Sequence, residues 1–235
     1  MKAIIGGTGV DTLDGLSLKR SMVQTRYGEV ELFITDQLVF LPRHGSSHSL
    51  PPHLINYRAN VAALKDLGVD EAIGIYAVGS ISQALSPGEI GIVSDFVDCT
   101  GGSREHTFFN GGASGVRHCA MDDVFDASLR ERMNILAPHI KDAGVYVCTN
   151  GPRLETKAEI RLYGRLGCDV VGMTLATEVS LLKEAGIRCL ALAYSINWAA
   201  GVGQANVSFI GEAETAVLKE EMTQLCCKTL LSCSN

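Results

Sequence analysis

The stretch RHGSSHSLPPH, residues 43–53, holds one arginine and three histidines. His44 and His48 stand four positions apart, a spacing that places two imidazoles on one face of a helix and suits zinc. A glycine and two serines separate them, however, and two prolines follow, so a helix is not favoured here. The stretch also contains no carboxylate that could serve as a third ligand. We therefore expect no metal at this site.

Arg43 beside His44 is better suited to binding an anion. A guanidinium presents paired, planar donors to phosphate or carboxylate oxygens, and its charge disfavours a neighbouring metal cation. We therefore predict that Arg43 and His44 bind an anion. His53 follows two prolines and lacks an evident partner, which is typical of a histidine with a structural place. A zinc hydrolase that uses His44 and His48 is the alternative.

A glycine-rich turn, GGTGV, follows the first strand-like run KAII. The stretch reads GGTGVD, with no glycine at the sixth place, so the dinucleotide fingerprint G-x-G-x-x-G is incomplete. A turn of this kind lets backbone amides, together with the Thr8 hydroxyl, approach a phosphate. Two alternatives stay open, a Rossmann-type cofactor protein that uses Gly6–Gly9 and a turn with only a structural purpose.

The elements that must position these residues alternate along the chain. Short apolar runs rich in β-branched residues are separated by longer patterns with helical periodicity, which predicts an α/β fold. Strands are expected at 2–5, 71–80, 89–98, 144–149, 168–173 and 187–197, with two or three short strands in 21–41. Helices are expected at 56–68, 124–137, 154–167, 176–186 and 211–231. No repeat or linker interrupts this pattern.

The residues that follow the predicted strands form a chemically coherent set. In open α/β sheets, ligands bind beyond the carboxyl ends of the strands. The residues at these ends are Thr8, Arg43, His44, Ala77, Gly79, Ser80, Met173, Thr174 and Asn197. We expect them to gather at one edge of the sheet.

The composition excludes some classes of function. The chain has 235 residues, 46% of them apolar and 6% aromatic, so an aliphatic core is expected. A chain of this length buries about 70% or more of its unfolded surface in one core, and we predict a single domain, residues 1–235. The net charge of −6 argues against non-specific binding to nucleic acid, although a local cationic pocket remains compatible with it.

The eight cysteines form no recognisable disulfide framework. Five are scattered without a CxxC pair, and Cys226, Cys227 and Cys233 cluster near the C-terminus. Reduced, buried thiols are expected, with a redox role or a terminal disulfide as the alternative. The chain begins with a strand-like run, lacks a secretory h-region and contains no run of about 18 apolar residues. We expect a cytoplasmic protein with no membrane partner.

Several motifs resemble one enzyme family. They are RHGSSHSLPPHLINYRANVAALKDLGV, AVGS, PGEIGIVSDFVDCT and GPRLETKAEIRLYGRLGCDVVGMTLATEVSLLKEAGI. Over almost the whole chain, the sequence is similar to the trimeric purine nucleoside phosphorylases, and within them to the 5'-methylthioadenosine phosphorylase branch. The resemblance implies a central mixed β-sheet flanked by helices and a homotrimer. It also implies phosphorolysis, in which inorganic phosphate attacks C1' of a nucleoside and releases the purine, with no cofactor and no metal.

The resemblance also implies roles for individual residues. Phosphate would be held by Thr8, Arg43, His44, the backbone of Ala77, and Thr174. His48 and Met173 would face the ribose, and the branch usually has a threonine where this chain has Tyr76. The chemistry fits independently, because an oxocarbenium-like transition state favours a dianion on one side of the sugar and a donor on the leaving purine. The residues expected to be catalytic are His44, Glu155 and Asn197.

The base-reading positions differ from the methylthioadenosine branch. In YSINWAAG, Asn197 and Ala199 stand where that branch has two aspartates, and Glu155 stands where it usually has serine. The pair Glu155 and Asn197 resembles the 6-oxopurine phosphorylases. A carboxylate accepts from N1–H of hypoxanthine and an amide donates to O6 or N7, whereas adenine presents a lone pair at N1. The alternative makes Glu155 a charge near a helix N-terminus and Asn197 a turn residue.

The 5' side of the substrate is predicted to be apolar. Phosphorylases of ordinary nucleosides bind the 5'-hydroxyl with a histidine after the base-reading asparagine, but this chain has no histidine after His139. The corresponding stretch GQANVSFIGEAE offers Val207, Phe209 and Ile210 instead. We therefore expect S-methyl-5'-thioinosine as substrate. A 5'-methylthioadenosine phosphorylase and an inosine or guanosine phosphorylase are the alternatives.

Overall fold

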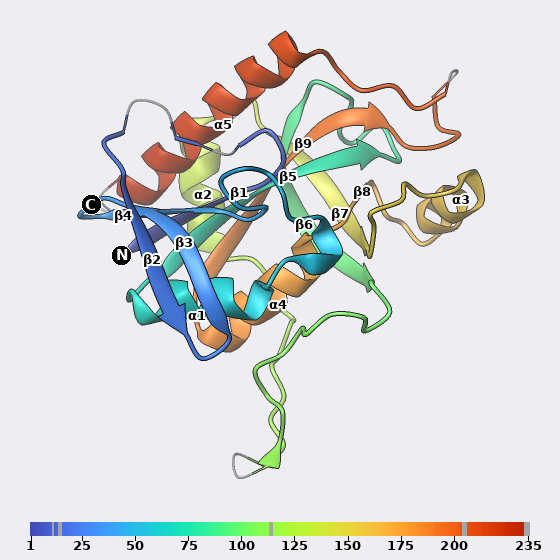
Figure 1. Ribbon diagram of the computed structural model, residues 1–235. Helices are drawn as coiled ribbons and strands as arrows, with labels where there is room; N and C mark the ends of the chain where they lie inside the picture. The colour runs from blue at the N-terminus through green and yellow to red at the C-terminus, as the bar shows by residue number, and fades with distance from the viewer. Residues whose placement is uncertain (11, 14–15, 113–114, 204–205, 233–235) are drawn as a thin grey trace.

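The computed structural model describes residues 1–10, 12–13, 16–112, 115–203 and 206–232. Its centre is a nine-stranded sheet with the order β2-β3-β4-β1-β5-β8-β7-β6-β9, in which β9 also pairs with β5 (Figure 1). The strands are β1 (Lys2–Gly6), β2 (Lys19–Thr25), β3 (Gly28–Ile34), β4 (Leu38–Pro42), β5 (Glu71–Ser80), β6 (Ile90–Cys99), β7 (Lys141–Thr149), β8 (Val170–Gly172) and β9 (Arg188–Trp198). Because β9 pairs with both β5 and β6, the strands from β5 to β9 close into a small barrel.

The sheet is mixed, as the family resemblance implies. The pairs β1–β4, β1–β5, β5–β9, β6–β7 and β7–β8 are parallel. The pairs β2–β3, β3–β4, β5–β8 and β6–β9 are antiparallel. The carboxyl ends of β1, β4, β5 and β9 therefore meet at one edge of the sheet.

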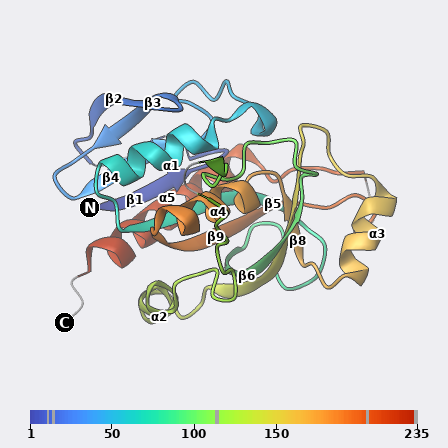
Figure 2. The ribbon, with the colours of Figure 1, turned by 90° about the horizontal axis from the view of Figure 1, so that it is seen from below.

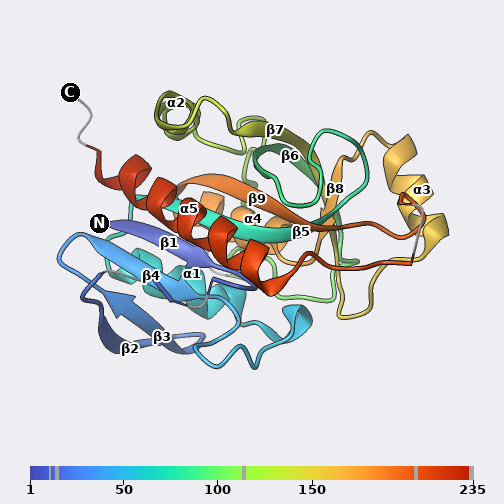
Figure 3. The ribbon, with the colours of Figure 1, turned by 90° about the horizontal axis from the view of Figure 1, so that it is seen from above.

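Helices cover the two faces of the sheet. They are α1 (Tyr57–Asp66), α2 (Ala127–Leu136), α3 (Lys157–Arg165), α4 (Leu175–Ala185) and α5 (Glu212–Leu231), with a short 3-10 helix at Pro52–Leu54. Figures 2 and 3, which view the molecule from below and above, show α1 and α4 together on one side and α5 crossing the other, where α2 also packs against it. Only α3 lies apart, at the far end of the barrel (Figure 1).

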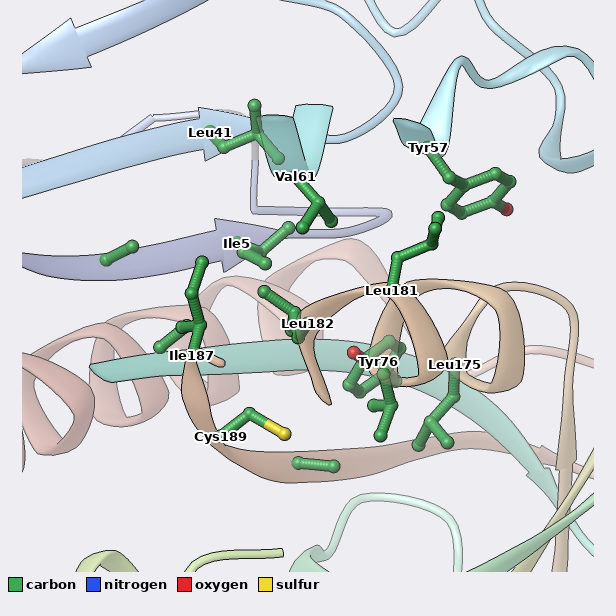
Figure 4. Close-up of a cluster of buried hydrophobic side chains, with 14 of the residues drawn as sticks. Ile5, Leu41, Tyr57, Val61, Tyr76, Leu175, Leu181, Leu182, Ile187 and Cys189 are labelled. Atoms are coloured by element: carbon green, nitrogen blue, oxygen red, sulfur yellow. The ribbon is translucent and has the colours of Figure 1, made fainter. Parts of the chain in front are cut away.

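The alternation of side chains along each strand explains the two layers. On β1, Ile5 packs on the side of α1 and α4, and the preceding Ile4 packs on the side of α2 and α5. Figure 4 shows Ile5 and Leu41 facing Val61 of α1 and Leu182 of α4. Strand β5 is almost wholly buried because helices cover both of its faces, which explains its nearly continuous apolar sequence.

Capping residues set the helix limits more narrowly than the periodicity does. The Asn56 side chain accepts from the backbone of Ala59 and begins α1, as expected. Asp126 caps α2 and Thr156 caps α3, so both helices begin about three residues later than predicted from the sequence. The strand expected at 168–173 is shortened to Val170–Gly172, and the 3-10 helix at Pro52–Leu54 was not expected.

The segment between β6 and α2 forms an arm that extends away from the sheet on the side of α1 and α4 (Figure 1). Its root is bound to the end of α4, since the Thr107 hydroxyl and the Phe108 amide both donate to the Glu184 carboxylate, at 2.7 and 2.6 Å. The seven described cysteines are free thiols, and Cys233 lies outside the described residues. Within the described ranges, no helix combines the length and apolarity needed to cross a bilayer.

Candidate functional site

A cavity of about 170 Å³ opens at the carboxyl edge of the sheet. The predicted site residues among its lining are Thr8, Arg43, His44, Ala77, Glu155, Met173, Thr174 and Asn197. His48 is not among the described residues that line it. That histidine is exposed, adopts a positive φ of 51°, and its ring centroid lies 4.7 Å from that of His44. The two histidines lie in a run of turns rather than on a helix, as the sequence indicates.

Arg43 is held by a carboxylate that the sequence reasoning missed. Its Nε and Nη2 donate to the two oxygens of Glu178 at 2.6 and 2.7 Å, and both side chains are almost fully buried. Burial alone would lower the pKa of Arg43, but the Glu178 carboxylate outweighs it and the pKa is raised. The guanidinium is therefore a fixed cation at the wall of the cavity.

Tyr76 does not take the place of the threonine that the resemblance implies at its position. It is not among the described cavity-lining residues, and its hydroxyl donates to Glu178 at 2.6 Å while its ring lies 4.5 Å beneath the Arg43 guanidinium. Burial and the Glu178 charge raise the pKa of Tyr76 well above its usual range, so the hydroxyl keeps its proton. Tyr76 therefore supports the Arg43–Glu178 pair from below.

Gly7 leaves the space that Arg43 occupies. A Cβ at this position would lie 2.5 Å from Arg43 Nη1 and 2.7 Å from the Ile75 carbonyl. That carbonyl accepts from Nη1 at 3.1 Å. It is accessible to Arg43 because β1 pairs with β5 only as far as Gly74 and β8 pairs with the same edge only from Gly79, which leaves residues 75–78 of that edge without a described strand partner. The glycine-rich turn thus makes room for a guanidinium.

His44 presents a hydrogen-bond acceptor to the cavity. Its Nδ1 lies 2.8 Å from the Leu50 carbonyl, which can only accept, so Nδ1 carries the ring hydrogen. Burial, followed by the charge of Arg43, lowers the pKa of His44 to about 4. The ring is therefore neutral at pH 7, and Nε2 has a free lone pair.

The N-terminus of α4 points towards the same cavity. Thr174 is its N-cap and lines the cavity, and among the described contacts its side chain makes no capping hydrogen bond. The first N–H groups of a helix have no partner within the helix, and the helix dipole favours an anion near them. Thr174 and this helix end are consequently suited to a phosphate.

Glu155 and Asn197 reach the cavity from different elements. Glu155 directly precedes Thr156, the N-cap of α3, and its Oε1 accepts from the Thr149 hydroxyl at 2.7 Å. The capping hydrogen bonds of α3 are made by Thr156 and Glu159, so Glu155 is not needed for them. Asn197 stands on β9, and its Nδ2 donates to the Trp198 carbonyl at 2.8 Å, which leaves one amide hydrogen and Oδ1.

The remaining wall of the cavity is largely apolar. Val207 and Phe209 line it, together with Met173, Leu154 and Ile196. Ile210, expected on the same wall, instead packs against the core on the side of α2 and α5. The backbone explains this difference, because the Ile210 amide donates to the Ile196 carbonyl and turns the chain towards α5. Gln204 and Ala205 of the same stretch lie outside the described residues.

Comparison with known proteins identifies the family. The model of the family described as "Phosphorylase superfamily" matches residues 2–232. The chain belongs to this superfamily. This membership gives no support to the zinc-hydrolase and Rossmann alternatives. Among the described residues, no group of three or more His, Cys, Asp or Glu side chains is arranged to hold a metal.

Individual members of the superfamily are similar over most of the chain. A probable S-methyl-5'-thioinosine phosphorylase of Pseudomonas syringae is 41% identical over 226 residues, which cover 92% of this chain and 91% of the relative. The 6-oxopurine nucleoside phosphorylase of Pyrococcus furiosus is 39% identical, with coverages of 85% and 80%. The methylthioadenosine phosphorylase of Schistosoma mansoni in complex with adenine superimposes with a TM-score of 0.86 at 28% identity, covering 97% of this chain and 90% of that structure. The predicted phosphorylase-like α/β fold is confirmed.

Proposed function

We propose that this protein catalyses the phosphorolysis of S-methyl-5'-thioinosine, a 6-oxopurine nucleoside, to hypoxanthine and 5-methylthioribose 1-phosphate. The observation that carries this proposal is that Glu155 and Asn197 line one cavity with the anion-binding residues of three strands and a helix end. The names of the Pseudomonas syringae and Pyrococcus furiosus relatives support it. Residues 1–235 would act as one cytoplasmic phosphorylase domain, assembled as a homotrimer.

Phosphate would bind at the end of the cavity formed by Arg43, His44 and the N-terminus of α4, with the Thr8 hydroxyl and the Ala77 amide as further donors. Hydrogen phosphate carries one P–OH group, and His44 Nε2 would accept its hydrogen. The unprotonated oxygens would then face Arg43 and the sugar. Guanidinium, hydroxyl and backbone N–H donors would together bind the dianion, so the reaction would need no metal and no cofactor.

The sugar would lie between the two ends, with Met173, which lines the cavity, facing the ribose. One phosphate oxygen forms a bond to C1' as the bond from C1' to purine N9 breaks, and the bonding electrons leave with the purine. The phosphate group gives up its proton, and the purine takes up a proton to become hypoxanthine. Glu155 would accept from N1–H of the base, and Asn197 would donate to O6 or N7, where negative charge develops as the base leaves. The 5'-methylthio group would contact the apolar wall formed by Val207 and Phe209.

A substrate panel tests this proposal. Initial rates would be measured with methylthioinosine, methylthioadenosine, inosine and adenosine, each with and without added phosphate. We expect phosphate-dependent turnover with the highest kcat/KM for methylthioinosine. Higher kcat/KM for methylthioadenosine would make the protein a methylthioadenosine phosphorylase, and higher kcat/KM for inosine would make it an ordinary 6-oxopurine phosphorylase. Turnover that persists without phosphate would replace phosphorolysis by hydrolysis.

A further inference from the structure

The base-reading carboxylate is tied to a buried threonine. Thr149 is the last residue of β7, and its hydroxyl donates to Glu155 Oε1 at 2.7 Å. Thr149 is 9% exposed, and it is not among the described residues that line the cavity. Thr149 therefore cannot act on a ligand directly within this geometry. The hydroxyl also lies 3.5 Å from the carbonyl of Gly172, which lines the cavity, but its shorter bond is to Glu155. Glu155 is therefore the main route by which Thr149 can affect the base.

The backbone that carries Thr149 is itself fixed. Strand β7 pairs with β6 up to Cys99 and Thr149. Beyond the strand, the guanidinium of Arg104, 7% exposed, donates to the Asn150 carbonyl at 2.7 Å and to the Asn150 side-chain oxygen at 3.1 Å. Arg104 also reaches the Thr149 carbonyl at 3.4 Å. A side chain held by such a support keeps its geometry when a ligand binds.

The hydrogen bond from Thr149 affects how the Glu155 carboxylate can meet a purine base. An ionised carboxylate only accepts hydrogen bonds, and the bond from Thr149 to Oε1 holds Glu155 in the orientation in which it lines the cavity. A 6-oxopurine satisfies the carboxylate with its N1–H, whereas a 6-aminopurine opposes it with a lone pair at N1. To avoid that opposition, Glu155 must rotate away and lose the Thr149 bond. The support thus adds to the cost of accepting the wrong base.

We propose that Thr149 is a positioning residue that sets the preference of Glu155 for 6-oxopurines over 6-aminopurines. This inference rests on the proposed function, since it assumes that Glu155 contacts the base. It concerns the discrimination between bases and not the reaction with phosphate. The two properties are therefore separable by measurement.

The test compares Thr149→Val, which removes the hydroxyl at nearly constant shape, with Thr149→Ser, which keeps it. The loss of a hydrogen bond to a charged group changes an equilibrium constant or a rate constant by about tenfold. We expect Thr149→Val to lower the ratio of kcat/KM for methylthioinosine over methylthioadenosine by about tenfold, with the phosphate KM unchanged. The serine variant should stay close to the wild-type ratio.

A binding measurement separates this inference from the proposed reaction. Trp198, the one tryptophan of the chain, adjoins Asn197, so its fluorescence can report binding of free hypoxanthine and free adenine. We expect the hypoxanthine-to-adenine affinity ratio to fall in Thr149→Val even if no phosphorolysis is found. If no turnover is found but the affinity ratio is shifted, the proposed reaction would be overturned and the role of Thr149 supported. A ratio equal to that of the wild type would overturn that role.

A double-mutant cycle guards against a merely structural effect. In a Glu155→Gln background, Thr149→Val should change the substrate ratio no further, because the carboxylate through which it acts is gone. An equal loss for both bases, accompanied by a raised phosphate KM and a lowered melting temperature, would show a structural role only and would overturn the proposal.

Discussion

Arg43 and Glu178 form a forked pair in which Nε and Nη2 each donate to a different carboxylate oxygen, over 2.6 and 2.7 Å. The residues are separated by 135 positions in the sequence, and both side chains are almost completely shielded from solvent. The pair largely cancels its own charge. A phosphate in the cavity therefore meets an orientated donor rather than a strong positive field, and the N-terminus of α4 has to contribute a substantial part of the attraction.

Removal of Arg43 is expected to have two separable effects. Arg43→Ala should weaken phosphate use by about 2–4 kcal/mol, through the loss of a charge-assisted donor. It should also destabilise the fold by about 3–5 kcal/mol, because Glu178 is left as an uncompensated buried charge. The variant Arg43→Ala/Glu178→Gln should recover much of that stability in thermal unfolding but keep the raised phosphate KM. Recovery of both properties together would contradict a direct role of Arg43 in phosphate binding.

Gly7→Ala is expected to weaken phosphate binding without changing a polar residue. The added methyl would lie 2.5 Å from Arg43 Nη1 and 2.7 Å from the Ile75 carbonyl, so the guanidinium must shift. We expect a phosphate KM raised by tenfold or more, in line with about 1–3 kcal/mol for overpacking. Gly211→Ala is the matched control, because no described atom lies within 4 Å of a Cβ there. Equal phosphate KM values for the two variants would refute the steric argument.

The stability of the protein should fall as the pH is lowered towards 4, in part because of His44. The folded-state pKa of about 4 lies below the ordinary value of 6.5, so the unfolded chain takes up this proton first. The contribution of His44 to stability is complete above about pH 6.5 and is lost as the pH falls towards 4. His44→Gln should therefore show a shallower decrease in melting temperature across this window than the wild type. Parallel curves would mean that the histidine does not titrate as described.

Asn197→Asp is expected to shift the base preference. A carboxylate at this position accepts from a 6-amino group and repels O6, whereas the amide of Asn197 donates to O6 or N7. The ratio of kcat/KM for methylthioadenosine over methylthioinosine should rise by about tenfold or more. Asn197→Ala is the control, since it removes the donor and adds no acceptor. An unchanged ratio in the aspartate variant would contradict the assignment of Asn197 to the base.

The apolar wall gives a prediction for the 5' side. Phe209→Ser removes apolar contact surface and should lower kcat/KM for methylthioinosine. The expected loss of transition-state stabilisation is about 1–3 kcal/mol, with a smaller loss for inosine. Val217→Ser is a suitable control, because Val217 is exposed on α5 and is not among the described cavity residues. An equal effect on both nucleosides would show that Phe209 does not contact the 5' group.

Local signals in the sequence were sufficient to find the strands, although β8 is shorter than expected and β7 begins three residues earlier. Apolar runs such as EAIGIYAVGS are read without knowledge of neighbours, and the sheet then brings Thr8, Arg43 and Asn197 to one edge whatever their distance along the chain. The helix starts were less accurate, because the capping residues Asp126 and Thr156 lie inside the apolar patterns that signalled α2 and α3.

The supporting contacts were beyond the reach of sequence patterns. Glu178 lies in the first turn of α4, where an acidic residue is ordinary, and nothing local indicates that it is buried against Arg43. Tyr76 and Thr149 likewise gain their roles only from packing between distant elements. A buried carboxylate needs a cation as its partner, so burial is the property that would have pointed to Glu178. Burial depends on the tertiary structure and is not visible in the local sequence.

The two ends of the cavity are built from different parts of the chain. The proposed phosphate end takes its side chains from the turns after β1 and β4 and from the start of α4, whereas the proposed base end takes Glu155 from the loop after β7 and Asn197 from β9. The residues proposed to read the base are therefore different from those proposed to hold phosphate. During evolution, such a scaffold can exchange one purine for another through a few replacements while its phosphate chemistry is conserved. Base preference should accordingly diverge faster among descendants of this fold than the use of phosphate.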